Sequence, residues 1–239
     1  MPELILKGGF ARAIFLCLQT YRCSRVLEIG SFDGDGSTQV LISAIKGLPG
    51  RHLDCLEFIP QRYANLVKNT REHDWVRPFQ LTSISYDSLS KTDFERDVRP
   101  FYAGQPTSQI ETIQSWWRSD VEQMKTYKNG FLNSNPLQYD AVLIDGGEFT
   151  GFDEFRILRE HANCFMLDDT ICFKCSEVRR ELISDPAWEM IFDDIKERNG
   201  SSIFVRKAII PTGRTRLFRN LMASVRFVVL SLRQQLLSG

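Results

Sequence analysis

The sequence lacks the features that define several specialised protein classes. It carries no net charge, because 30 basic residues balance 30 acidic ones; this excludes a generally basic nucleic-acid-binding protein and an acidic disordered one. It contains no run of 18 uncharged apolar residues, so no membrane-spanning helix is expected. Six cysteines in 239 residues are too few for a disulfide scaffold. The apolar stretch near the N-terminus lacks a cleavage site, so we expect a cytoplasmic protein.

What is present is an ordinary globular composition with 43% hydrophobic residues. The length suits one large α/β domain, which we place at residues 1–210, followed by a distinct tail at 211–239. Short apolar runs predict strands at residues 25–30, 52–58, 79–84, 139–145, 164–168, 188–193 and 202–207, and helical patterns lie at 10–20, 37–46, 60–69, 152–161 and 177–183.

This alternation of strands and helices predicts a doubly wound, Rossmann-like parallel sheet of about seven strands. The last connection is different, because only about eight residues separate the two final strands and a parallel crossover needs a dozen or more. The last strand is therefore expected to run antiparallel, as part of a hairpin.

Residues 85–136 interrupt the alternation, since they contain no convincing strand. A helical spacing joins Ile110, Ile113, Trp117, Val121 and Met124. Long excursions in compact domains are usually lids or binding loops, so we expect this insertion to fold over the cleft. Its aromatic side chains would contact a substrate or pack a small core of their own.

The strongest motif is the segment VLEIGSFDGDGST at residues 26–38, where a buried strand ends in a glycine-rich turn before a helix. Parallel sheets bind ligands at this end of their strands, and glycines let the backbone approach a ligand closely. Phe32 stands where the second glycine of a dinucleotide-binding G-x-G-x-x-G would be, counted from Gly30. Counted from Gly34, Gln39 replaces the third glycine. The dinucleotide motif is thus absent, and the alternative to a ligand site is a tight turn that binds nothing.

The spacing E-x-G-x-x-x-G-x-G-S, with Glu28 inside the strand and Glu57 at the end of the next strand, resembles the first motifs of class I S-adenosylmethionine-dependent methyltransferases. The resemblance, which includes the antiparallel last strand, implies that Glu57 accepts hydrogen bonds from the ribose hydroxyls. It also implies that the end of the third strand contributes to the adenine pocket. The residues expected to bind the cofactor are Glu28, Gly30, Ser31, Gly34, Gly36, Ser37, Glu57 and Ser83.

Carboxylates gather after the fourth and fifth strands. Asp145 and Glu148 follow the former, and Asp168 and Asp169 end the latter. Neighbouring strands would bring all four together, and a divalent cation such as Mg²⁺ would neutralise them. The pattern resembles the catechol-type O-methyltransferases and the cephalosporin hydroxylase-like proteins, which implies Asp145, Asp168 and Asp169 as metal ligands. It departs from them at residues 147–149.

Two alternatives to a metal site stay open. The acidic residues would form a helix cap and a solvated rim, or Asp145 or Glu148 would act as a general base without a metal. Lys174 nearby is long enough to reach the acceptor cleft, but we expect it to be solvated.

The tail carries five arginines and no acidic residue between residues 211 and 239, and its apolar residues follow a helical spacing. A basic amphipathic helix at 214–237 can lie on an anionic membrane surface, pair with a second copy, or dock on the acidic body of its own chain. These readings stay open, and the first would place the protein at the inner membrane surface.

Together these features predict S-adenosylmethionine-dependent methyl transfer to a small-molecule acceptor. The expected reaction is O-methylation of a hydroxyl, and no nucleic-acid partner is expected. The alternatives are a non-catalytic nucleoside-binding module and an iron-dependent hydroxylase of the cephalosporin hydroxylase-like type.

Overall fold

The structure, a computed structural model, describes residues 8–89, 91–126, 129–134 and 138–237, with the main chain alone for 214–218 and 231–237. Its centre is a single sheet in the order β3-β2-β1-β4-β5-β7-β6. The strands are β1 (Arg25–Ile29), β2 (His52–Leu56), β3 (Val76–Phe79), β4 (Ala141–Ile144), β5 (Cys164–Asp168), β6 (Trp188–Asp194) and β7 (Ser201–Arg206). The pairs among β1 to β5 are parallel, and β7 is antiparallel to both β5 and β6. The predicted seven-stranded Rossmann-like sheet with an antiparallel last strand is confirmed.

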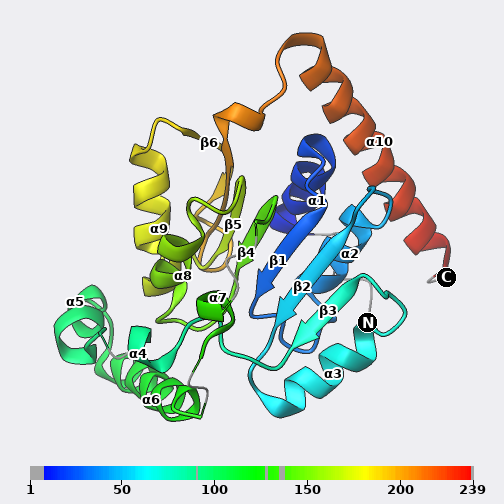
Figure 1. Cartoon of the computed structure of the whole chain (residues 1–239). Coiled ribbons are helices and arrows are strands. Elements are labelled where there is room, and N and C mark those ends of the chain that lie inside the picture. Colours follow the sequence, from blue (N-terminus) through cyan, green and yellow to red (C-terminus); the bar gives the residue numbers. More distant parts are fainter. Residues whose placement is uncertain (1–7, 90, 127–128, 135–137, 238–239) are drawn as a thin grey trace.

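Helices cover both faces of this sheet (Figure 1). One face packs against α1 (Gly9–Tyr21), α2 (Ser37–Ile45) and α3 (Pro60–Thr70), with the long α10 (Gly213–Leu237) outside α1 after the short turn η3 (Lys207–Ile209). The other face packs against α8 (Gly151–Leu158) and α9 (Phe173–Ser184). Successive strand residues alternate between the two cores: Val26 belongs to the first, and Leu27 to the second.

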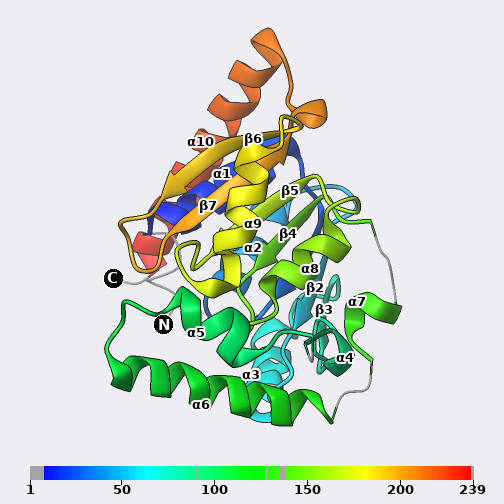
Figure 2. The ribbon, with the colours of Figure 1, turned by 90° about the vertical axis from the view of Figure 1, so that its left-hand side faces the viewer.

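The insertion forms α4 (Tyr86–Leu89), the π-helical turn η2 (Phe94–Val98), α5 (Arg99–Phe101), α6 (Thr107–Met124) and α7 (Phe131–Ser134). These helices lie at the end of the sheet where the parallel strands end (Figures 1 and 2). The base of the insertion is closed, because the amides of Phe131 and Leu132 donate to the carbonyls of Thr82 and Ser83, both at 2.9 Å. The insertion is therefore placed to cover the strand ends.

Two predicted boundaries are wrong. The third strand spans Val76–Phe79 and not residues 79–84, because the carbonyls of Thr82 and Ser83 bond to the insertion and not to β2. The ninth helix begins at Phe173 and not near Glu177. This earlier start places Lys174 in the first turn of α9, beside the strand ends.

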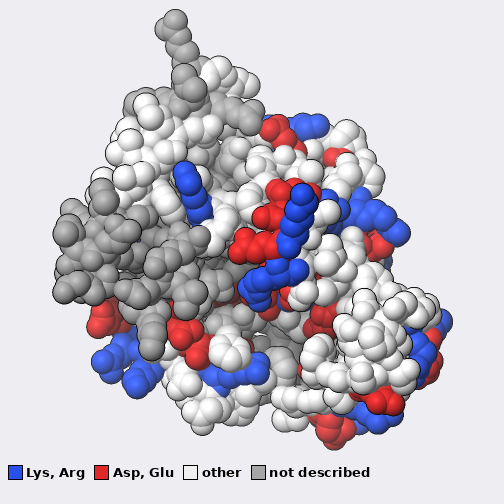
Figure 3. Space-filling view, turned by 180° about the vertical axis from the view of Figure 1, so that it is seen from behind, with Lys and Arg blue, Asp and Glu red and all other residues white. Residues whose placement is uncertain are grey.

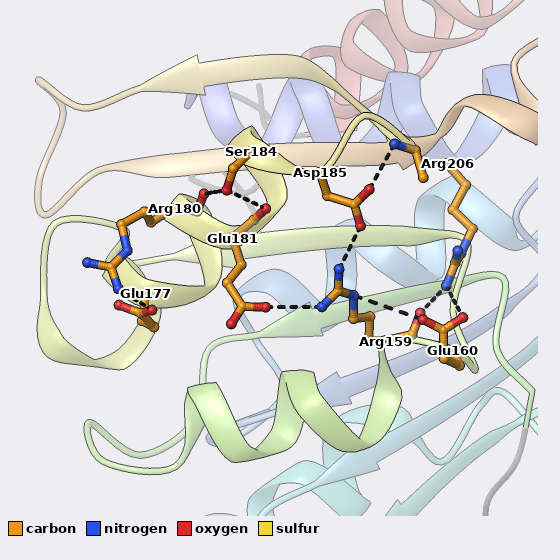
Figure 4. Close-up of polar contacts among 9 residues, drawn as sticks. Arg159, Glu160, Glu177, Arg180, Glu181, Ser184, Asp185 and Arg206 are labelled. Carbon is orange, nitrogen blue, oxygen red and sulfur yellow. Dashed lines mark hydrogen bonds and ion pairs between the residues drawn. The ribbon is translucent and has the colours of Figure 1, made fainter.

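Charged side chains of both signs lie beside one another on the face shown in Figure 3, consistent with the balanced composition. At the end of the sheet away from the insertion, ion pairs join α8 to its neighbours (Figure 4). Arg159 Nη1 lies 3.2 Å from Glu181 Oε2, and Arg159 Nη2 lies 2.7 Å from Asp185 Oδ2. Arg206 Nη2, at the end of β7, lies 3.2 Å from Glu160 Oε2. These contacts hold α8, α9 and β7 together, so the helices behind the site have a fixed spacing.

Candidate active site

The glycine turn after β1 fits tightly against the neighbouring strand end. Gly30 has a φ of +88°, and a β-carbon there would collide with the backbone carbonyl of Asp145. Gly34 has a φ of +78° and lies against Leu66. Both conformations favour glycine. The turn thus brings the end of β1 directly beside the end of β4.

Glu28 is fully buried below this turn. Its two carboxylate oxygens accept hydrogen bonds from Ser37 Oγ and Thr38 Oγ1, both at 2.6 Å. Burial raises the pKa of Glu28, and the hydroxyl bonds oppose that rise. Glu28 lines neither of the cavities described below, so its visible role is to fix the start of α2.

A cavity of about 510 Å³ lies between the strand ends and the insertion. Its walls come from the turns after β1, β2, β3 and β4 and from α3, α6 and α8. Of the predicted site residues, it is lined by Gly30, Glu57, Ser83, Asp145 and Glu148. The structure therefore brings together the residues assigned from sequence to the ribose, the adenine and the catalytic step.

Glu57 is held rigidly at one edge of this cavity, since its Oε1 accepts a 2.8 Å hydrogen bond from the amide of Ile59. Burial raises the pKa of the Glu57 carboxyl, while that amide and the Arg62 guanidinium lower it. A carboxylate with one oxygen anchored presents its other oxygen in a fixed direction.

A second cavity of about 360 Å³ lies on the other side of the glycine turn. It is lined by Ser31, Gly36 and Ser37, and it shares Gly30, Phe32 and Asp145 with the first cavity. Phe32 has a left-handed φ of +53°, and the Arg62 guanidinium lies 4.3 Å from its ring centroid. The glycine turn and Asp145 therefore contribute to the walls of both cavities.

The acidic cluster contains three carboxylates and not four. Oxygens of Asp145, Asp168 and Asp169 lie within 4.8 Å of one another. Glu148 instead accepts a hydrogen bond from the Tyr102 hydroxyl, whose oxygen accepts one from the Phe173 amide at 3.0 Å. Tyr102 of the insertion thus links Glu148 to the start of α9.

The expectation that Lys174 is solvated is wrong, because this side chain is only 4% exposed. Its ammonium lies 2.7 Å from Asp169 Oδ2 and 3.1 Å from Asp145 Oδ1. Burial raises the pKa of Asp145 to about 7, with Lys174 opposing the rise. Burial also acts to raise the pKa of Asp169, but Lys174 and Asn199 outweigh it, and that pKa falls.

The helix α6 closes the first cavity with Trp116, Ser119, Asp120 and Gln123. The pKa of Asp120 is raised to about 6, mainly by burial and then by nearby Glu148, while Arg62 lowers it. Trp117 points elsewhere: it packs edge-on against Phe149, with ring centroids 5.0 Å apart. The insertion thus forms one wall of the first cavity, and its action as a lid stays a prediction.

Sequence reasoning missed Glu154. This residue of α8 is fully buried, lines the first cavity, and accepts a hydrogen bond from Ser83 Oγ. By geometry its Oε2 has no hydrogen-bond partner among the residues that the structure describes. Burial raises the pKa of the Glu154 carboxyl, and the nearby hydroxyls of Ser83 and Thr150 oppose that rise. A buried carboxylate oxygen without a partner is costly in an empty protein and points to a donor supplied by a ligand.

No protein-family model matches the chain, and no curated protein matches it in sequence. The fold nevertheless resembles several solved methyltransferases. A caffeoyl-CoA O-methyltransferase-like protein from Staphylococcus aureus shares 12% identity at a TM-score of 0.53, covering 84% of this chain and 85% of that one. An O-methyltransferase from Streptomyces achromogenes, involved in tomaymycin synthesis and determined with S-adenosylmethionine, shares 14% identity at 0.52, covering 86% and 83%. A methyltransferase from Podospora anserina with bound S-adenosylhomocysteine shares 10% at 0.50, covering 82% and 77%. The chain therefore has the class I methyltransferase fold.

Proposed function

We propose that the protein transfers a methyl group from S-adenosylmethionine to a hydroxyl of a small molecule. The observation that carries this proposal is the 510 Å³ cavity at the glycine turn, in which Glu57 and the orphan oxygen of Glu154 both line the wall. Structurally similar methyltransferases determined with this cofactor or its product support it.

The residues present fit the cofactor. Glu57 would hold the ribose, and Ser83 with Glu154 would hold the adenine, whose amino group can satisfy the free oxygen of Glu154. The amides at the start of α2 and the backbone of Gly30 would hold the methionine end along the second cavity. When bound, the cofactor supplies an already activated methyl group.

The remaining task of the protein is to position the acceptor and take its proton. Positioning is a proximity effect, and the α6 wall of the cavity would hold the acceptor and exclude water from it. Asp145 lines both cavities, so it is the proposed proton acceptor, with Glu148 of the first cavity as the alternative.

The test is calorimetric binding of S-adenosylhomocysteine to the full chain and to Glu57→Gln. Loss of the ribose contacts should weaken binding by about 1–3 kcal/mol. Glu72→Gln, at an exposed glutamate between α3 and β3, serves as the matched control. If the wild-type chain does not bind this ligand, or if both variants bind it equally, the assignment is wrong. Binding without turnover on any acceptor would favour the nucleoside-binding alternative.

A further inference from the structure

Lys174 is fixed in the middle of the acidic cluster. Its ammonium contacts Asp169 Oδ2 at 2.7 Å and Asp145 Oδ1 at 3.1 Å, and it lies 3.5 Å from the Gly146 carbonyl oxygen. The backbone of Lys174 is fixed in place, because its carbonyl oxygen packs against Gly151 of α8 so closely that a β-carbon at position 151 would not fit. The ammonium is therefore built into the site.

A divalent cation does not fit beside it. Such a cation needs carboxylate oxygens at roughly 2.0–2.6 Å, and one oxygen of Asp145 and one of Asp169 already contact the Lys174 ammonium. The third carboxylate, Asp168, has the Arg198 guanidinium 3.7 Å from its Oδ2. Two basic side chains thus supply the charge that a metal would bring, and they would repel one.

We propose that Lys174 is the resident cation of this site and that the protein works without a divalent metal. Lys174 is then a positioning residue: it neutralises Asp169 and holds the carboxylate of Asp145, a residue that lines both cavities. The part assigned to Asp145 rests on the proposed methyl transfer. The iron-dependent alternative would need a metal at these same carboxylates.

Titration of the full chain with Mn²⁺, followed by electron paramagnetic resonance, tests this directly and needs no turnover. The wild type should bind no Mn²⁺ more tightly than about 1 mM, the weak end of protein sites for hard cations. Lys174→Met should create a site at least tenfold tighter, Lys174→Arg should not, and adding Asp169→Asn to Lys174→Met should remove it.

A wild-type site below about 100 µM that Asp169→Asn abolishes would overturn the proposal. That measurement decides the question even if Lys174→Met fails to fold. Failure of the proposed function is separate, because it would show as absent S-adenosylhomocysteine binding whatever the Mn²⁺ result.

A second and independent observation concerns α10. One face of this helix docks on its own chain: Ala223 and Phe227 are buried, Phe227 packs edge-on against Phe15 with centroids 5.5 Å apart, and Arg226 Nη1 lies 2.5 Å from Gln19 Oε1. Of the three sequence-based readings of the tail, docking on its own body is therefore seen for this part of the helix. It leaves the opposite face to be explained.

That opposite face is apolar and open to solvent. Its members recur at helical spacing and are 40–61% exposed: Leu221, Met222, Val225, Val228 and Val229. Figure 1 shows α10 along the outer edge of the molecule. None of the helices in the described part of the chain is long and apolar enough to cross a bilayer. An apolar stripe of this kind can lie on a membrane but not span it.

We infer that this face of α10 binds the surface of a bilayer containing anionic lipid. The tail from residue 211 to 239 has five arginines and no acidic residue. Two copies pairing through α10 would place two positively charged tails beside each other, and neither tail has a carboxylate to neutralise the other. Anionic lipid headgroups supply the negative charge that a second copy lacks.

Flotation with phosphatidylglycerol-containing vesicles and with pure phosphatidylcholine vesicles tests the inference. The full chain should float with the former, lose most binding at high salt, and lose it in Val225→Asp/Val228→Asp. Ile195→Asp, at an exposed apolar residue in the β6–β7 turn, should still bind. Absent flotation, or a dimer in light scattering that the double variant dissociates, would refute membrane binding.

Discussion

Ser83, in the turn after β3, donates a hydrogen bond to Glu154 Oε1 of α8, and the other oxygen of Glu154 has no partner within the described ranges. The two residues are 71 positions apart in sequence, yet they form one wall of the larger cavity. A buried carboxylate of this kind selects a ligand that donates at that position.

We therefore expect the wild type to prefer S-adenosylhomocysteine over its inosine analogue, which carries a carbonyl in place of the amino group. The preference should be at least tenfold, or about 1.4 kcal/mol, because a carbonyl at the position of the amino group accepts hydrogen bonds and cannot donate one to Glu154. Glu154→Gln should lose most of it, since an amide can donate as well as accept. Calorimetry measures the affinity of the wild type and of Glu154→Gln for both ligands. The same ratio of affinities in the two proteins would show that Glu154 does not recognise the adenine.

Gly30→Ala should destabilise the fold and abolish ligand binding. The new β-carbon would collide with the carbonyl of Asp145, and the φ of +88° would cost about 1–3 kcal/mol in backbone strain alone. Gly47→Ala is the control, because no atom lies within 4 Å of a β-carbon there. Urea unfolding of the two variants should separate them clearly, and equal stability would contradict the close contact of β1 with β4.

Asp120 should make stability depend on pH. Its pKa is raised from 3.8 to about 6 in the folded chain, mainly by burial, so its contribution is fully present below pH 3.8 and is lost as the pH rises through 6. Asp120→Asn should remove this decline and gain on the order of 1–3 kcal/mol relative to wild type between pH 4 and pH 7. Parallel pH profiles of the two proteins in urea unfolding would show that Asp120 titrates normally.

Tyr102→Phe should loosen the insertion. The lost hydroxyl joins Glu148 to the Phe173 amide, so its removal leaves both without that partner at a cost of about 1–3 kcal/mol. We expect faster proteolysis within residues 85–136 and a changed fluorescence of Trp116 in the cavity wall. Tyr63→Phe on α3 is the control, and identical cleavage in both variants would show that this contact does not hold the insertion.

Much of the fold and part of the site follow from sequence, because they depend on local chemistry. The glycine turn, the acid at the end of β2 and the short final hairpin are each encoded within one short segment of the sequence. The predicted third strand is misplaced because residues 79–84 have the apolar pattern of a strand, whereas the carbonyls of Thr82 and Ser83 bond to the insertion.

The roles that the sequence did not assign depend on packing between distant segments. Lys174 matters because α9 begins at Phe173, a start at which no side chain caps the helix. Asp120 and Glu154 reach the cavity only through the rotation of α6 and α8, which no local pattern specifies. The spacing of Asp145, Asp168 and Asp169 does not decide whether they hold a metal, because Lys174, which contacts two of them, lies on the separate helix α9.

The insertion leaves the sheet and returns to it at one point, where Phe131 and Leu132 bond to Thr82 and Ser83 and Gly130 packs against Ile84. The two ends of the insertion are thus held together at the edge of the sheet by backbone hydrogen bonds, while its buried side chains, among them Val98 and Ile113, share one core with the strands. A change in the length or shape of the insertion would therefore reshape the α6 wall of the first cavity, while the order of the strands is set by their own pairing.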